Sequence, residues 1–437
     1  MRLRIHPVSR LGGQVEVPGD KSISHRAALV GALAEGVTEI RGYLEAEDCL
    51  RTIAAVEALG VDVTRKGPGE YRIAGAGLRG LGEPANVIDC GNSGTTARLL
   101  LGALAGQPFW TFLTGDESLR RRPMGRVVEP LRRMGATIVG RAEGGRLPLA
   151  VRGAERPTTL AYELPIASAQ VKSAILLAGL CADGPVSVTE PAQSRDHSER
   201  MLRQFGARLE TRGLTTTVSP GALAGTTVIV PGDISSAAFL LVAGLIVADA
   251  RVTVAGVGLN PTRAGVLEAL GAMGARLEIA PAARGGVGEP SGAITAAGSE
   301  LVGTTVAGAL VPRLIDEIPA LAVAALVARG RTEIRDAAEL RVKESDRVAA
   351  LARELGAMGA RIAERPDGLL IEGGARLRGA RVASGGDHRI AMALAVAGLV
   401  AEGQTVVEDT DCIATSFPQF AELLNALAGE PAVTMEP

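Results

Sequence analysis

An internal repeat constrains the fold of this chain more than any other feature of its sequence. VPGD occurs at residues 17–20 and again at 230–233, and each copy precedes a helix-length run of small apolar residues. Two further patterns recur along the chain at intervals of about 70 residues, which predicts a fold assembled from similar structural units.

One recurring pattern is an amphipathic helix followed by a short alternating strand. Apolar residues such as Val348, Leu351 and Leu355 follow helical spacing. A glycine near the end of most copies suits the left-handed position that terminates a helix. The copies lie at residues 50–63, 128–139, 201–210, 266–279, 348–362 and, in degraded form, 420–429.

The other recurring pattern is a helix that is apolar nearly all round, which predicts a helix buried on every side. Each copy opens with Ser or Asp, residues that cap helix N-termini, and leads through a turn into a β-rich stretch. The six copies lie at residues 22–36, 93–107, 168–184, 233–249, 316–330 and 387–403. The chain is therefore predicted to be α/β (α+β in some schemes), with six units of two helices and several strands.

The two VPGD segments divide these six units into three plus three. We expect one lobe at residues 20–229, with units one to three, and a second lobe at residues 1–19 plus 230–437, with units four to six. The VPGD segments would then be the crossings between lobes, where Pro stiffens the chain and Gly permits unusual backbone angles.

Composition excludes several classes of protein. The formal net charge is −2 and aromatic residues make up 2% of the chain, which argues against a nucleic-acid surface. The four cysteines form no CxxC pair, so a reducing cytoplasm fits better than a disulfide framework or a zinc site. No signal peptide is evident at the N-terminus, and the longest apolar run, residues 237–248, is too short to span a bilayer. We expect a cytoplasmic protein without a nucleic-acid or membrane partner.

Unusual polar residues gather at the N-terminal ends of the apolar helices. Ser and Asp there are explained by capping alone, but Lys21, Arg26 and Arg389 are not, because cations oppose the helix dipole at this end. Several cationic N-termini in one chain indicate bound anions. Unit four, with the sequence ISSAAF, lacks such residues and is predicted to need only packing.

Lysine is rare here, with only four copies among 46 basic residues, which favours a role that needs a cation able to release a proton. Lys21 is one of the polar residues at the helix N-termini, and Lys343 lies in the segment RVKESDR (341–347). An ordinary i,i+4 charge pattern is the alternative interpretation of Lys343 and Arg347.

Nine segments distributed along the whole chain resemble the 5-enolpyruvylshikimate-3-phosphate synthase family, with features of its second class. The segments are PGDKSISHRA, GNSGTTARLLLG, RRPMGRVVEPL, SAQVKSAILLAGL, SRDHSERML, LIDEIPALAVAA, ELRVKESDR, DHRIAMALAVAG and IATSFPQF. The resemblance implies the two-lobe enolpyruvyl transferase fold of six βαβαββ units, three per lobe, with the active site in the cleft between the lobes. It also implies transfer of the enolpyruvyl group of phosphoenolpyruvate to the 5-hydroxyl of shikimate 3-phosphate, with release of phosphate. This is a step of the shikimate pathway towards chorismate and the aromatic amino acids. We expect a monomer that needs no metal or organic cofactor.

The resemblance also assigns the site residues. Those implied for shikimate 3-phosphate are Lys21, Ser22, Arg26, Ser168, Gln170, Arg195, Asp316 and Lys343. Those implied for phosphoenolpyruvate are Lys21, Gly94, Arg122, Gln170, Arg347 and Arg389. Asp316 is the implied base for the 5-hydroxyl, and Glu344 with Lys21 is the implied acid for the methylene carbon.

Two departures and two alternatives qualify this assignment. Ala169 stands where one class of the family has a second Ser, and Thr415 stands where many members have a lysine, so no cation is predicted there. One alternative is the related transferase acting on UDP-N-acetylglucosamine, which typically has a reactive loop cysteine that residues 111–135 lack. The other is a non-catalytic or RNA-end-processing protein with the same repeats, which the acidic balance and scarce aromatics disfavour.

Overall fold

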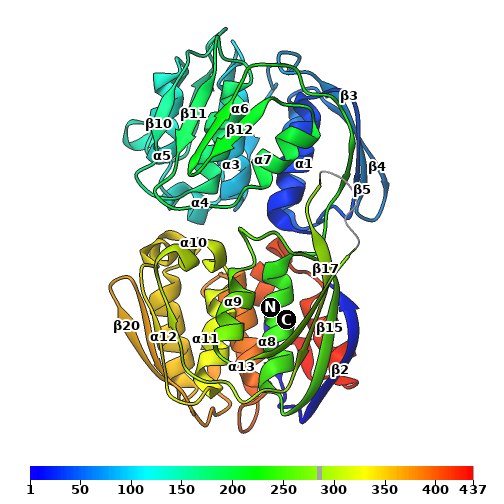
Figure 1. The fold of residues 1–437 in the computed structure, drawn as a ribbon, viewed down its shortest axis with the longest axis vertical. Coiled ribbons are helices and arrows are strands. Elements are labelled where there is room, and N and C mark those ends of the chain that lie inside the picture. The colour runs from blue at the N-terminus through cyan, green and yellow to red at the C-terminus, as the bar shows by residue number, and fades with distance from the viewer. Residues whose placement is uncertain (283–287, 437) are drawn as a thin grey trace. The chain divides into compact units, whose positions relative to one another are not determined.

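The computed structural model describes residues 1–282 and 288–436 of the chain. These residues form two compact units (Figure 1). The terminal unit contains residues 1–18, 231–282 and 290–436, and the central unit contains residues 19–230 with 288 and 289. Among the described residues, no helix is both long and apolar enough to cross a membrane.

The strands of the described residues form six four-stranded sheets, and all six sheets have the same pattern of strand pairing. In each sheet one edge strand pairs parallel to its neighbour and the other two pairings are antiparallel. The sheets of the central unit are β14-β3-β5-β4 (Thr227–Ile229, Glu35–Arg41, Glu70–Ala76, Asp62–Gly67), β6-β7-β9-β8 (Ile88–Asp89, Trp110–Thr114, Leu149–Arg152, Thr137–Gly140) and β10-β11-β13-β12 (Ala161–Glu163, Val186–Thr189, Thr215–Val218, Leu209–Arg212).

The terminal unit repeats this arrangement. Its sheets are β16-β17-β15-β2 (Arg276–Pro281, Ser291–Ala297, Asp249–Gly258, Arg10–Glu16), β18-β19-β21-β20 (Thr305–Val306, Arg331–Ile334, Gly368–Glu372, Arg361–Arg365) and β22-β23-β1-β24 (Arg381–Ala383, Thr405–Glu408, Arg2–Ile5, Val433–Glu436). The first strand of the chain, β1, lies between β23 and β24 and pairs antiparallel with both. Both ends of the described chain therefore belong to one sheet.

Each repeat has one apolar and one amphipathic helix, in the order that the sequence predicts. The apolar helices are α1 (Lys21–Leu33), α3 (Gly94–Leu104), α6 (Ala169–Gly179), α8 (Ile234–Ile246), α11 (Ile318–Val327) and α13 (His388–Gly398). The amphipathic helices are α2 (Glu47–Ala58), α5 (Gly125–Arg133), α7 (His197–Gln204), α9 (Gly265–Ala272), α12 (Arg347–Ala357) and α14 (Phe420–Ala428). Short helices are α4 (Glu117–Arg121), α10 (Val311–Leu314) and the 3-10 turns η1 (Arg141–Gly144), η2 (Gly308–Leu310), η3 (Ala338–Val342) and η4 (Thr410–Thr415).

The apolar helices form the core of each unit. In the terminal unit, α8, α11 and α13 pack against one another, and Figure 1 shows them as neighbouring helices in the middle of that unit. Every residue from Ile318 to Leu326 of α11 is buried, as predicted for a helix that is apolar all round. In the central unit, α3 packs against both α1 and α6. The predicted α/β fold of six two-helix units is thus confirmed.

The glycines of the two VPGD segments lie where backbones approach closely. A Cβ atom on Gly19 would lie 1.8 Å from the carbonyl oxygen of Gly42, in the central unit. A Cβ on Gly232 would lie 2.9 Å from a methyl group of Val17, in the terminal unit. Asp233, which follows Gly232, donates its backbone N–H to the carbonyl of Pro18 at 2.9 Å. Close approach therefore explains why glycine occupies both positions.

Candidate active site

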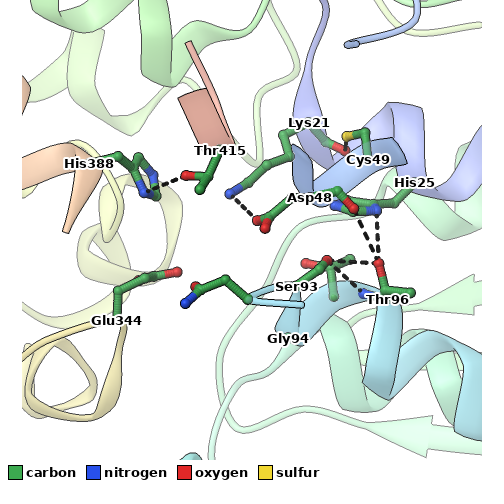
Figure 2. A network of polar contacts seen from close by, with 12 residues as sticks. Lys21, His25, Asp48, Cys49, Ser93, Gly94, Thr96, Glu344, His388 and Thr415 are labelled. Carbon is green, nitrogen blue, oxygen red and sulfur yellow. Dashed lines mark hydrogen bonds and ion pairs between the residues drawn. The ribbon is translucent and has the colours of Figure 1, made fainter. Parts of the chain in front are cut away.

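Lys21 is the first residue of α1 in the central unit and makes an ion pair. Asp20 caps this helix by accepting a hydrogen bond from the N–H of Ile23 at 2.9 Å. The Lys21 Nζ atom lies 2.9 Å from Oδ2 of Asp48, which comes from α2 (Figure 2). The Lys21 side chain keeps 14% of its surface exposed, so the ammonium group is held in place and still reaches the surface.

Arg26 lies one turn further along α1 and is buried. Its Nε donates to the Ser198 hydroxyl at 2.7 Å, and its Nη2 donates to the Ser173 hydroxyl at 2.9 Å. A third bond, of 2.9 Å, runs from Nη1 to the carbonyl of Ser22. Burial lowers the pKa of Arg26 to about 10, although the carboxylate of Glu199 opposes the shift. Arg26 therefore joins α1 to α6 and α7 as a buried cation.

Arg195 lies shortly before α7 and is half-buried. Its positive charge helps to lower the pKa of Arg26, although burial has the largest effect and the nearby carboxylate of Glu199 opposes the shift. The two guanidinium groups therefore interact electrostatically. Two predicted ligands of shikimate 3-phosphate thus concentrate positive charge beside the start of α7.

The starts of α3 and α6 bring together a second group of predicted residues. Ser168 caps α6 by accepting from the N–H of Val171. The Gln170 amide donates to the Thr95 hydroxyl at 2.9 Å, and its oxygen accepts from Nη1 of Arg98 at 2.8 Å. Arg98 was not among the residues predicted from the sequence, although it lies on α3 one turn after Gly94.

Gly94, the first residue of α3, lies against two arginines. A Cβ added at Gly94 would lie 2.8 Å from Nη1 of Arg98 and 3.3 Å from Nη1 of Arg122. Arg122 donates to the side-chain oxygen of Asn92 at 2.6 Å and is 8% exposed. The glycine thus leaves room for two guanidinium groups beside a helix N-terminus, where an anion is favoured.

A buried chain of polar side chains joins the starts of α1 and α3. The His25 Nδ1 atom lies 2.7 Å from the Thr52 hydroxyl, which lies 2.7 Å from the Thr96 hydroxyl. Thr96 in turn donates to the cap residue Ser93 at 2.7 Å, as part of the network drawn in Figure 2. Burial, assisted by the charge of nearby Lys21, holds the pKa of His25 well below its usual value, so His25 is neutral at pH 7.

The terminal unit brings three predicted cationic residues together around Asp316, which lies just before α11. Oδ1 of Asp316 lies 3.2 Å from Nη1 of Arg347, 3.9 Å from Nζ of Lys343 and 4.0 Å from Nε of Arg389. The backbone carbonyl of Asp316 also accepts a hydrogen bond from Nη1 of Arg389 at 3.1 Å. Burial lowers the pKa of Lys343, although Asp316 partly offsets this effect.

Arg347, at the start of α12, is fully buried among carboxylates. Its Nη2 donates to Oε2 of Glu344 at 2.6 Å, and its Nε donates to Oδ2 of Asp387 at 2.8 Å. Burial disfavours the charged form, but Asp387, Glu344 and Asp316 outweigh it and raise the pKa of Arg347. The predicted acid Glu344 is therefore in direct contact with a permanently charged arginine.

Thr415, at the position where the resemblance implies a lysine in many members, lies at the end of η4. Its hydroxyl donates to the carbonyl of Cys412 at 2.7 Å and lies 3.4 Å from Nδ1 of His388 (Figure 2). Burial raises the pKa of Cys412 to about 11 and that of Cys90 to about 12, so both are poor nucleophiles near pH 7. Within the described residues, no group of His, Cys, Asp or Glu is arranged to hold a metal ion.

Unit four differs from the prediction made for it. The start of α8 was expected to need only packing, but Ser235 there is bonded to the buried ion pair of Arg263 and Glu317. The prediction was wrong because these partners come from segments about 30 and 80 residues further along, which helical spacing does not relate to Ser235.

Comparison with known proteins identifies the family. The family model of EPSP synthase (3-phosphoshikimate 1-carboxyvinyltransferase) matches residues 5–424. A curated 3-phosphoshikimate 1-carboxyvinyltransferase of Desulforamulus reducens is 54% identical over 98% of this chain and 100% of its own length. That of Gloeobacter violaceus is 58% identical over 96% of this chain and 97% of its own length. A solved EPSP synthase from Acinetobacter baumannii is 45% identical, with a TM-score of 0.88 over 100% of both chains. The chain therefore belongs to the EPSP synthase family.

Proposed function

We propose that the residues described above, from both units, bind and convert the two substrates of the EPSP synthase reaction. Membership of the family over nearly the whole chain makes this protein a 3-phosphoshikimate 1-carboxyvinyltransferase of the shikimate pathway. It transfers the enolpyruvyl group of phosphoenolpyruvate to the 5-hydroxyl of shikimate 3-phosphate and releases phosphate.

The charges of the two groups support a division of the work. The two substrates together carry two phosphates, of about −1.5 to −2 each, and two carboxylates. In the central unit five of the site residues are cationic, namely Lys21, Arg26, Arg98, Arg122 and Arg195, and Lys21 is paired with the carboxylate of Asp48. In the terminal unit, by contrast, the three cations around Asp316 are accompanied by three carboxylates, those of Asp316, Glu344 and Asp387. We therefore assign most of the anion binding to the central unit and the acid–base steps to the terminal unit.

For shikimate 3-phosphate the proposed ligands are Lys21, Ser22, Arg26, Ser168, Gln170, Arg195, Asp316 and Lys343. For phosphoenolpyruvate they are Lys21, Gly94, Arg122, Gln170, Arg347 and Arg389. The arginines suit this role because a guanidinium group can hold a phosphate or carboxylate through two parallel hydrogen bonds.

The observation that carries the proposed chemistry is the position of Asp316. Its carboxylate is 13% exposed and lies within 4.0 Å of three cationic side chains, so it is fixed in orientation while still reaching the surface. We assign Asp316 as the base that accepts the proton of the 5-hydroxyl. Glu344, assisted by Lys21, donates a proton to the methylene carbon of phosphoenolpyruvate and takes one back as phosphate leaves.

The proposal includes no metal or organic cofactor, and we propose a monomer that acts in the cytoplasm without a nucleic-acid partner. The net charge of −2 and the 2% content of aromatic residues support the last point. The alternative acceptor UDP-N-acetylglucosamine is not favoured by the family match, which names EPSP synthase along residues 5–424.

Phosphate release from phosphoenolpyruvate tests the assignment, with shikimate 3-phosphate and UDP-N-acetylglucosamine offered in parallel. We expect release only with shikimate 3-phosphate. Asp316→Asn should lower kcat by about 10² to 10⁴, the usual contribution of a general base. Glu372→Gln, which changes a half-exposed carboxylate of the same unit, serves as the control. An Asp316→Asn variant with the wild-type rate would refute the assigned base.

A further inference from the structure

Glu317 directly follows Asp316 and is held by a buried polar network. Its side chain is 0% exposed. Oε1 of Glu317 accepts a hydrogen bond from Nη1 of Arg263 at 2.8 Å and a second one from the hydroxyl of Ser235. A buried carboxylate with two such donors has a single favoured orientation, because moving it would leave its charge unpaired.

Arg263 extends this network to the start of α8. Its Nη2 donates to the Ser235 hydroxyl at 2.6 Å and lies 3.5 Å from Oδ1 of Asp233. Asp233 caps α8 by accepting from the N–H of Ser235 at 2.8 Å. The Arg263 side chain is 3% exposed. The network therefore joins the start of α8, the segment before α9 and the residue before α11 without reaching the surface.

The backbone of Glu317 is fixed as well as its side chain. Its N–H donates to the carbonyl of Leu314 at 2.9 Å, and its carbonyl accepts from the N–H of Leu321 at 2.9 Å, within the first turn of α11. In the same peptide unit as the Glu317 N–H, the carbonyl of Asp316 accepts a hydrogen bond from Nη1 of Arg389 at 3.1 Å. Only one peptide bond separates the carboxylate-bearing Cα of Asp316 from the anchored Glu317.

We propose that Glu317 is a positioning residue for Asp316, anchored by Arg263 and Ser235. This inference rests on the base role proposed for Asp316. Because Glu317 anchors the N–H of the peptide unit that follows the Asp316 Cα and Arg389 holds the carbonyl of that same unit, the direction of the Asp316 carboxylate depends on both. A displacement of about 1 Å at a reacting group can cost about 10² in rate.

Glu317→Gln is the direct test, since it keeps the size of the side chain and removes its charge. The control is Glu354→Gln on α12, because Glu354 is also a mostly buried carboxylate, bonded to Arg353 at 2.7 Å and to the N–H of Ala383 at 2.9 Å. For Glu317→Gln we expect kcat to fall by at least about tenfold at a temperature where the protein is folded. The acidic limb of the pH profile of kcat/KM should also move, and the control should show neither effect.

A merely structural role predicts a different result. Glu317→Gln would then lower the unfolding temperature but leave kcat and the pH profile of the folded protein as in the wild type, and this outcome would overturn the proposal. If Glu317→Gln does not fold, Ser235→Ala decides instead, because it removes one hydrogen bond to Glu317 and retains the Arg263 ion pair. A folded Ser235→Ala variant with unchanged kcat would also overturn it.

A double variant separates this proposal from the proposed function. If Glu317 acts through Asp316, adding Glu317→Gln to Asp316→Asn should cause no further loss of phosphate release, because the positioned group is already gone. A further loss as large as in the wild-type background would show that Glu317 acts elsewhere. An Asp316→Asn variant with full activity would instead remove the base assignment itself, and the positioning role with it.

Discussion

Lys172 provides the sharpest prediction for stability, because its charge is buried between two carboxylates. Its side chain, on α6, is 2% exposed, and Nζ lies 2.6 Å from Glu190 and 2.7 Å from Glu199. Glu199 lies on α7 beside Ser198, which accepts the hydrogen bond from Arg26. Replacement of Lys172 by Met keeps most of the volume of the side chain and leaves two buried carboxylates without this cation.

The size of the effect follows from the cost of an unpaired buried charge. Removal of one partner from a buried ion pair costs about 3–5 kcal/mol. The central unit spans residues 19–230, and in folded regions of this size 1 kcal/mol changes Tm by about 2–4 °C. Lys172→Met should therefore lower the Tm of the central unit by about 6–20 °C.

The pH dependence gives a second, independent measure. Burial opposes the charge of Lys172, but Glu199 and Glu190 outweigh it and raise its pKa. The stabilisation from a raised lysine pKa is fully present below the unfolded pKa, of about 10.4, and is lost as the pH rises through the folded value. In Lys172→Met the two carboxylates disfavour a double negative charge, so protonation of one is favoured and the variant should lose less stability at pH 5 than at pH 8.

Calorimetry or circular dichroism, recorded at both pH values, measures these changes. Lys66→Met is the matched control, because Lys66 is an exposed lysine of the same unit and its replacement should change Tm little. A Tm for Lys172→Met within about 2 °C of the wild type, the shift expected for less than 1 kcal/mol, would refute this account of the buried pair.

Two further predictions concern the substrates. Gly94→Ala should raise the KM for phosphoenolpyruvate by about tenfold, or about 1.4 kcal/mol, because the new methyl group would displace Arg98 and Arg122. An unchanged KM in steady-state kinetics would contradict the anion-binding role assigned to these two arginines. Burial lowers the pKa of Lys343 from its ordinary 10.5, so the alkaline fall of kcat/KM should begin below that pH. Lys343→Arg should move this alkaline limb of the pH profile to higher pH, since guanidinium stays charged. A limb at the same pH in Lys343→Arg would show that another group titrates.

The sequence predicted the fold class because the apolar helices are unusual. A helix such as α11 is buried on all sides, and burial of that kind leaves an uninterrupted apolar run that is visible without a structure. The pairing of the parallel edge strands with their neighbours was not predicted. Strand β14, at Thr227–Ile229, pairs with β3 nearly 190 residues before it, and its three residues carry no signal for that pairing.

The candidate site was predicted from helix starts and from the family resemblance, and both have a physical limit. Spacing along one helix places Lys21 and Arg26 near a capped N-terminus, but it does not show that Arg98 reaches Gln170 on another helix. Similarly, Arg263 and Glu317 are 54 residues apart, and each one alone looks like an ordinary surface residue. Contacts between distant segments depend on packing, which local patterns do not encode.

The position of β1 between β23 and β24 has a consequence for folding during synthesis. Ribosomes add about 5–20 residues per second, so roughly 20–90 s separate the emergence of Arg2–Ile5 from that of Val433–Glu436. For most of this interval, until Thr405–Glu408 emerges, β1 lacks both of its neighbours and offers an unpaired edge to other chains. Residues 19–230, in contrast, are contiguous and can fold while the ribosome is still translating the second half of the message.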